Sequence, residues 1–327
     1  MRKLIGRMGL LLMVVLLASG TSYGVLLENI ADGTGAGYVS MDVNQGGTST
    51  DIQIGTDQWA TSGDLDRSVN ALAREDAVLL FTVGSTVDAT WLSDTSAWTV
   101  VSSSQTGIKE YITTMERTVG SATVTVKATT TLDPSPNKDI NQKYEISVTG
   151  AALTDVKFFE YNDFQIDLGT GDRSIAVGET GNSSGDYLDY SSVSGTPGSN
   201  LTLLAYDSFV SSGGVPAPPP GQIDIAIGIK EITTVSKWEI SEYSTIGDKL
   251  QDLVMGITTD LNLLNSDTTG GALVDGEYAF QYNLGTISSS GGATVEFQKV
   301  VTPVPEPSTL LLIGFGLLGL GIYRKKR

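Results

Sequence analysis

Residues 108–130 read IKEYITTMERTVGSATVTVKATT, and more of the fold follows from this stretch than from any other. Apolar and polar residues alternate along it, as they do in a half-buried β-strand, whose successive side chains point to opposite faces. Gly120-Ser121 interrupts the alternation and suits a two-residue hairpin turn of type II′, which has glycine first. The stretch therefore predicts a hairpin of two long antiparallel strands.

The turn also predicts which residues of the hairpin lie opposite each other. Val119 is expected to face Ala122, and Met115 is expected to face Val126. One face of the hairpin would then carry Tyr111, Met115, Val119, Ala122, Val124 and Val126. The other face would carry Glu116, Thr118, Thr123, Thr125 and Lys127. One dry face and one wet face are typical of an antiparallel sheet that packs on one side only.

Similar alternation recurs through the rest of the chain. It is clear at residues 223–230, where isoleucine occupies every second position. Further candidate strands are 38–43, 77–83, 98–101, 144–148, 156–161, 164–168, 201–206, 278–284 and 293–300. Helical spacing is confined to two short stretches, residues 64–75 and 247–254. Many short strands separated by Gly, Ser, Asn and Asp predict an all-β fold, an antiparallel β-sandwich.

The N-terminal segment has the pattern of an export signal. Arg2, Lys3 and Arg7 form a basic start, residues 10–17 are an uninterrupted apolar run, and small residues follow up to Gly24. The apolar run is shorter than the roughly 20 residues of a stable membrane span. We therefore interpret residues 1–24 as a signal peptide for Sec export, with the body of the protein outside the inner membrane.

The C-terminal segment, residues 304–327, has three parts in a fixed order. Pro305-Glu306-Pro307 comes first, an apolar run over residues 310–323 follows, and Arg324-Lys325-Lys326-Arg327 ends the chain. As a helix the apolar run would cover about 21 Å, just enough for a short transmembrane helix whose flanking residues enter the interface. The basic cluster is expected to stay on the cytoplasmic side of the membrane.

This tripartite tail closely resembles the PEP-CTERM sorting signal of Gram-negative bacteria, which combines a Pro-Glu-Pro motif, a short transmembrane helix and a basic terminus. The resemblance covers about 25 residues, with Pro305, Glu306 and Pro307 at the motif. It implies processing near the motif by exosortase and a transient C-terminal anchor in the inner membrane. It also implies a final place in the cell envelope or outside the cell, in connection with exopolysaccharide and biofilm production. Residues 278–297 resemble the closing strands of other exported PEP-CTERM β proteins.

Composition excludes several classes of function. The chain has 20 Lys+Arg against 37 Asp+Glu and contains no Cys and no His, which rules out disulfides, cysteine nucleophiles and histidine-based triads. The two ends hold seven of the basic residues and one of the acidic ones, which leaves a net charge of −23 on residues 25–303. Such a body repels nucleic acid, and it repels acidic polysaccharide unless divalent cations bridge the two.

The body, residues 25–303, contains one stretch that divides it. Residues 211–221 read SSGGVPAPPPG, a flexible piece followed by a polyproline-prone one. As a linker it would separate residues 25–210 from residues 222–303, and the second part is thin for a core of its own. We expect a long surface loop within one domain, with a two-domain arrangement as the alternative.

Acidic groups are the plentiful reactive side chains of the body. Glu160 and Asp163 lie beside aromatic residues, and a pair of carboxylates is all that glycoside hydrolysis needs. The alternative is a strand–turn–strand unit in which Asp163 satisfies turn amides. Four tryptophans offer either a sugar-stacking platform or ordinary packing, and we favour packing: Trp59, Trp91, Trp98 and Trp238.

Calcium is the inorganic ligand that oxygen-rich loops would hold. The loops in question contain Asp163, Asp167 and Asp172, then Asp186 and Asp189, then Asn265, Asp267 and Asp275. None follows the twelve-residue EF-hand pattern, and solvated turn acids explain them equally well. We therefore expect no catalytic residue, no resident metal and no cofactor, with calcium as the open alternative.

The sequence as a whole favours an exported, non-enzymatic β-sandwich that is structural or binds polysaccharide. Two alternatives remain open at this point. One is an exported carbohydrate-active enzyme that uses paired carboxylates, and the other is a calcium-dependent adhesin.

Overall fold

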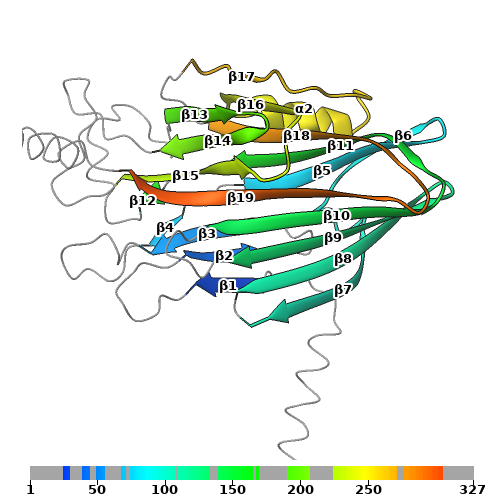
Figure 1. The fold of residues 1–327 in the computed structure, drawn as a ribbon, viewed down its shortest axis with the longest axis horizontal. Coiled ribbons are helices and arrows are strands. Elements are labelled where there is room, and N and C mark those ends of the chain that lie inside the picture. The colour runs from blue at the N-terminus through cyan, green and yellow to red at the C-terminus, as the bar shows by residue number, and fades with distance from the viewer. Residues whose placement is uncertain are drawn as a thin grey trace, which may run out of the picture.

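The computed structural model describes residues 25–29, 39–44, 49–55, 68–70, 74–107, 109–132, 139–164, 167–168, 190–206, 224–270 and 276–304. Across these residues the chain forms three sheets, and their strands are antiparallel except for one parallel pair. The predicted all-β fold is therefore confirmed (Figure 1).

The largest sheet has eight strands. In order across the sheet they are β13 (Tyr190–Thr196), β14 (Ser199–Tyr206), β15 (Asp224–Glu231), β19 (Gly292–Val304), β10 (Ile140–Gly150), β9 (Ala122–Leu132), β8 (Glu110–Val119) and β7 (Thr99–Thr106). Every neighbouring pair is antiparallel. Strand β15, which follows residues 211–221 in the chain, lies between β14 and β19, so segments from both sides of that stretch share one sheet.

A sheet of six strands packs against it. Its order is β17 (Ser266–Asp267), β16 (Lys237–Glu242), β18 (Gly276–Ile287), β11 (Leu153–Asp163), β5 (Arg74–Val83) and β6 (Thr86–Trp91). The parallel pair is β16 with β17.

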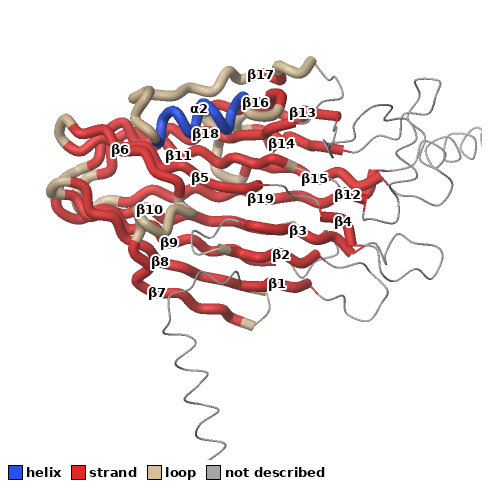
Figure 2. Tube along the Cα trace, turned by 180° about the vertical axis from the view of Figure 1, so that it is seen from behind, coloured by secondary structure: helices blue, strands red, loops and turns tan. Residues whose placement is uncertain are grey.

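The third sheet has five strands: β1 (Val25–Asn29), β2 (Val39–Val43), β3 (Ser49–Gly55), β4 (Ser68–Asn70) and β12 (Asp167–Leu168). Strand β3 lies against β5, and β1 lies against β8 and β9. Figure 2 shows how the five-stranded sheet continues the layer of the six-stranded sheet, so that both face the eight-stranded one.

The main core fills the space between these layers. It is built from the inward-facing residues of both large sheets, and aromatic rings occupy its centre. Tyr144 lies 4.8 Å from Phe158 and 6.0 Å from Phe297, measured between ring centroids. Close aromatic contacts of this kind stabilise the core beyond the area they bury.

The hairpin of β8 and β9 has the predicted turn and register. Val119 pairs with Ala122, and Met115 pairs with Val126. Gly120 has a φ of 58°, whereas Ser121 has no positive φ, as a type II′ turn requires. Met115 and Val126 are fully buried, so the apolar face of the hairpin points into the core as expected.

A second, smaller core lies on the other face of the six-stranded sheet. Helix α2 (Thr245–Val254) covers that face and buries Ile246, Leu250 and Leu253 against Phe159 and its neighbours. The predicted helix at 247–254 is thus confirmed. The helix expected over 64–75 is wrong where the structure describes it, because β4 and the start of β5 lie there.

Candidate functional site

A cluster of polar side chains lies between the two large sheets. Glu75 of β5 and Glu160 of β11 reach it from the six-stranded sheet, and Gln142 of β10 and Lys299 of β19 reach it from the eight-stranded sheet. These side chains point inward because they occupy the core-facing register of their strands. Lys299 follows Phe297 by two residues, for example, and both are fully buried.

The Lys299 amine is the centre of this buried cluster. Its Nζ lies 2.5 Å from Glu75 Oε1, 2.5 Å from Gln142 Oε1 and 3.3 Å from Glu160 Oε1. Gln142 Nε2 in turn donates to Glu75 Oε1 at 2.7 Å, and Asn162 Nδ2 donates to Glu160 Oε1 at 3.2 Å. Lysine is almost never fully buried unless it is paired, and here two carboxyl groups and a carboxamide pair with it.

Burial changes the acidity of groups in this cluster. Loss of solvent raises the pKa of Glu160 well above its usual range; Lys299 opposes this rise, and nearby Glu75 adds to it. Burial likewise raises the pKa of Tyr144 and of Tyr282, with the charge of Glu160 as a further cause. Among the described residues, Glu160 Oε2 and Asn162 Oδ1 have no hydrogen-bond partner. Burial therefore disfavours the charged form of Glu160.

The sequence singled out Glu160 but not its partners. Lys299, Gln142 and Glu75 were missed, although a signal for them existed. Each interrupts an otherwise apolar, inward-facing register, as Gln142 does between Ile140 and Tyr144. A polar residue at such a position is informative because it must find a buried partner.

Glu160 and Asp163 do not converge. Strand β11 continues through Asp163, where the sequence reading expected a turn, and residues three apart in a strand point to opposite faces. Glu160 faces the main core, fully buried, and Asp163 faces away from it. A polysaccharide cannot lie between these two carboxyl groups.

Two residues of the candidate calcium loops, Asn265 and Asp267, accept hydrogen bonds from neighbouring protein groups. Asn265 Oδ1 accepts from the Trp238 N–H at 3.1 Å, and Asp267 accepts from Ser191 Oγ at 2.7 Å and from the Thr269 N–H at 2.9 Å. Within the described part of the chain, no group of three or more acidic residues is placed to hold a metal ion. Asp172, Asp186, Asp189 and Asp275 lie outside the described residues.

The structure describes three of the four tryptophans, and each packs in or against a hydrophobic core. Trp91 and Trp98 are buried, and Trp238 packs against the main core while half-buried. Trp91 Nε1 donates to Gln251 Oε1 at 3.1 Å, and Trp98 Nε1 donates to the Trp91 carbonyl at 3.1 Å. Trp59 lies outside the described residues.

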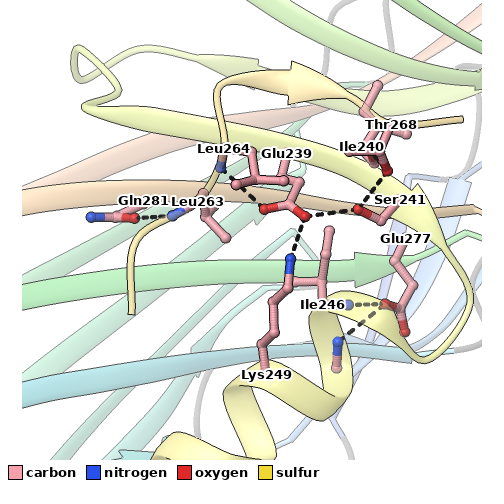
Figure 3. A network of polar contacts seen from close by, with 11 residues as sticks. Glu239, Ile240, Ser241, Ile246, Lys249, Leu263, Leu264, Thr268, Glu277 and Gln281 are labelled. Atoms are coloured by element: carbon pink, nitrogen blue, oxygen red, sulfur yellow. Dashed lines mark hydrogen bonds and ion pairs between the residues drawn. The ribbon is translucent and has the colours of Figure 1, made fainter. Parts of the chain in front are cut away.

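A second polar network lies beneath helix α2 (Figure 3). Glu239 accepts from Lys249 Nζ at 2.6 Å, from Ser241 Oγ at 2.8 Å and from the Leu264 N–H at 3.1 Å. Glu277 accepts from the Ile246 N–H at 2.6 Å, at the first turn of the helix. All four carboxylate oxygens here have protein donors, so the network fixes α2 and the following loop onto the sheet.

The outer face of the eight-stranded sheet carries polar side chains at every second position of β9 and β10. Opposite charges pair on this face. Across neighbouring strands, Lys127 Nζ lies 3.0 Å from Glu145 Oε2 and Lys143 Nζ lies 3.5 Å from Glu296 Oε1; within β10, Lys143 Nζ lies 3.5 Å from Glu145 Oε1. Hydroxyl and amide groups surround this row, from Thr114, Thr118, Thr123, Thr125, Thr129, Thr131, Asn141, Ser147, Thr149, Thr294 and Gln298. We call this surface the paired-charge face. Its Lys127 and Lys143 pair with Glu145 and Glu296, and Glu116 on the same face accepts from Thr125 Oγ1 at 3.3 Å.

The sorting-tail residues lie outside the described residues. This holds for Pro305, Glu306 and Pro307 and for Arg324, Lys325, Lys326 and Arg327. The last described strand, β19, ends at Val304, directly before the motif. No helix in the described part of the chain is long and apolar enough to cross a membrane.

Several solved structures with limited similarity to this chain are described as carbohydrate enzymes or their homologues. A chain described as a kojibiose phosphorylase from the human microbiome shares 10% identity at a TM-score of 0.38, over 93% of this chain and 29% of that one. A polysaccharide lyase shares 11% at a TM-score of 0.40, over 83% and 33%. A GalM/aldose epimerase homologue from C. elegans shares 7% at a TM-score of 0.44, over 86% and 99%. This chain thus spans about a third of the first two.

These structures correct one expectation. The sequence favoured a non-enzymatic protein, and that expectation is contradicted because the similar structures are enzymes or homologues of enzymes. With TM-scores of at most 0.44 among these structures, the similarity assigns no activity to this chain. No curated protein matches it.

The family comparison concerns the tail. Residues 303–327 match a family model described as the PEP-CTERM protein-sorting motif, which confirms the resemblance seen in the sequence. The motif supports export and processing by exosortase. The chain therefore carries a PEP-CTERM sorting signal behind a body of antiparallel β-sheets.

Proposed function

We propose that the protein acts in the cell envelope or extracellular matrix, where its body binds polysaccharide through the paired-charge face. Delivery rests on the sorting motif, which directs an exported chain to exosortase. The observation that carries the binding role is the chemistry of that face. It presents hydroxyl and amide groups at regular spacing on rigid strands, and these groups match the hydroxyls of a sugar chain.

Charge supports the choice of this face. Residues 25–303 carry a net charge of −23, so most of the surface is acidic. On the paired-charge face Lys127 and Lys143 are matched by Glu145 and Glu296, and the nearby Glu116 accepts from Thr125. A neutral polysaccharide can approach the row of matched charges without separating these ion pairs. An acidic one would be repelled by the rest of the body unless divalent cations are present.

The role of the face is tested with the protein purified from cells that express the full chain. Binding to insoluble neutral polysaccharides, such as cellulose and chitin, is measured by depletion from solution. The test variant combines Thr125→Val and Thr129→Val, which removes two hydroxyls from the face and keeps side-chain shape and β-propensity. The matched control combines Thr245→Val and Thr258→Val, two exposed threonines on the α2 side.

We expect the test variant to bind at least about tenfold more weakly than the unaltered protein, because several hydrogen bonds to sugar are lost. The control should bind as the unaltered protein does. Equal binding by the test variant, or no binding of the unaltered protein to any neutral polysaccharide, would refute the proposal.

A further inference from the structure

The buried cluster around Lys299 holds an amine against a carboxamide. Lys299 Nζ lies 2.5 Å from Gln142 Oε1, and the carbon bonded to that oxygen is an electrophile. Two groups held in contact inside a rigid core react with effective concentrations of about 10⁵–10⁸ M when their orbitals align. Both side chains are buried, with Lys299 fully so, and water therefore does not compete for the carboxamide.

Glu75 is placed to move the proton that such a reaction must transfer. Its Oε1 lies 2.5 Å from Lys299 Nζ and 2.7 Å from Gln142 Nε2, so one oxygen contacts both the attacking nitrogen and the leaving nitrogen. A carboxylate at this position takes a proton from the amine and passes it to the departing amide nitrogen.

The contacts of the cluster place a proton acceptor beside the amine. Lys299 Nζ lies 2.5 Å from Glu75 Oε1 and 3.3 Å from Glu160 Oε1, so Glu75 is its nearer carboxyl partner. An amine that has passed a proton to this carboxylate is a nucleophile.

The geometry points to an isopeptide bond between Lys299 and Gln142, formed spontaneously once the protein has folded. The bond from Nζ to the carboxamide carbon of Gln142 forms, and the bond from that carbon to Nε2 breaks. Glu75 carries one proton from Nζ to Nε2, and ammonia leaves. The step needs no oxidant, cofactor or second protein.

Such a bond would be a covalent cross-link in a chain that cannot form disulfides. The chain has no cysteine, so an exported body of this size has no disulfide to hold it closed. Gln142 and Lys299 are 157 residues apart in sequence and lie on neighbouring strands, β10 and β19. Joining them would close that long segment covalently.

Peptide mapping tests the inference on protein purified from cells that express the full chain. Trypsin releases residues 139–143, which contain Gln142, unless they are linked elsewhere. We expect these residues joined to the fragment that contains Lys299, with a mass lower than the sum of the two by one ammonia. Unlinked fragments of unaltered mass would overturn the inference. A Lys299 fragment joined instead to residues 75–109 or 158–173, with loss of one water, would also overturn it, because attack on Glu75 or Glu160 releases water.

Two variants separate chemistry from folding. Glu75→Gln keeps the shape of the side chain but cannot carry the proton, so the branched peptide should disappear while circular dichroism still shows a folded β protein. Glu239→Gln is the matched control, since Glu239 is also buried and paired with a lysine but lies beneath α2. It should keep the branched peptide. A branched peptide that persists in Glu75→Gln would overturn the role given to Glu75.

Discussion

Replacing Glu277 with alanine should detach helix α2 from the sheet beneath it. Glu277 is 1% exposed and accepts four hydrogen bonds: from Tyr161 Oη at 2.6 Å and from the backbone N–H groups of Ser244, Ile246 and Gly247 at 3.0, 2.6 and 3.1 Å. The helix has no other cap in the structure, because Ser244 has a φ of 65° and makes no side-chain capping bond.

The size of the effect follows from these contacts. A hydrogen bond to a charged group contributes about 1.5–3 kcal/mol, and loss of a helix cap costs about 1 kcal/mol. Ser244 is exposed, so water replaces that partner, whereas the Ile246 N–H and Tyr161 Oη are left without water. We therefore expect Glu277→Ala to lower the free energy of unfolding by about 4 kcal/mol.

Urea denaturation followed by circular dichroism measures this loss. Asp248→Asn is the matched control, because Asp248 is an acidic residue in the same first turn of α2 but is exposed. Asp248→Asn should lower the free energy of unfolding by about 0.5 kcal/mol, which is the contribution of a surface charge near a helix end. A loss below about 1 kcal/mol in Glu277→Ala, or equal losses in both variants, would refute the capping role.

Three further predictions concern stability. Burial raises the pKa of Glu160, so the unfolded state releases a proton at lower pH than the native state does, and stability falls as pH rises above about 4.3. Melting temperatures measured across pH should show a smaller fall in Glu160→Gln than in the unaltered protein. Parallel curves for the two proteins would contradict this prediction. Burial also acts to raise the pKa of Glu231, but backbone N–H groups outweigh it and lower that pKa. Glu231→Gln should therefore be less stable than the unaltered protein at neutral pH, with the difference shrinking as pH falls below about 4.3, and a constant difference would count against this. Gly228→Ala should lower the free energy of unfolding by about 3 kcal/mol or more in urea denaturation, because a Cβ there would lie 2.0 Å from the Leu203 carbonyl oxygen. Gly84→Ala is the control: its Cβ meets no atom within 4 Å, so it should lower that free energy by about 1 kcal/mol, from the positive φ alone. Similar losses in the two variants would argue against the clash.

Local patterns in the sequence were sufficient for the hairpin and for many of the strands, but not for β1, β3, β6, β13 and β16, which no predicted strand covered. The alternation in β8 and β9 and the Gly120-Ser121 turn gave the register, because one face must be buried and the turn allows one pairing. The short helix was likewise visible in its spacing. The expected helix at 64–75 was wrong because helical spacing of three apolar residues also fits short strands separated by turns.

The candidate site could be predicted only in part. Glu160 was identified, but its partners Lys299, Gln142 and Glu75 come from distant strands, and the sequence alone does not say which strands become neighbours. The cap of α2 shows the same limit, since Glu277 comes from β18, 33 residues beyond Ser244. The turn expected at Asp163 was wrong because β11 runs on to that residue, which places Glu160 and Asp163 on opposite faces.

The position of β19 has a mechanical consequence. The sorting motif begins at Pro305, directly after β19 ends at Val304, and β19 is hydrogen-bonded on one side to β10 and on the other to β15. While the tail is held in the membrane, tension on it enters the body along a strand in the middle of its largest sheet. Both rows of hydrogen bonds share that load, so pulling on the tail would not peel a strand from an edge.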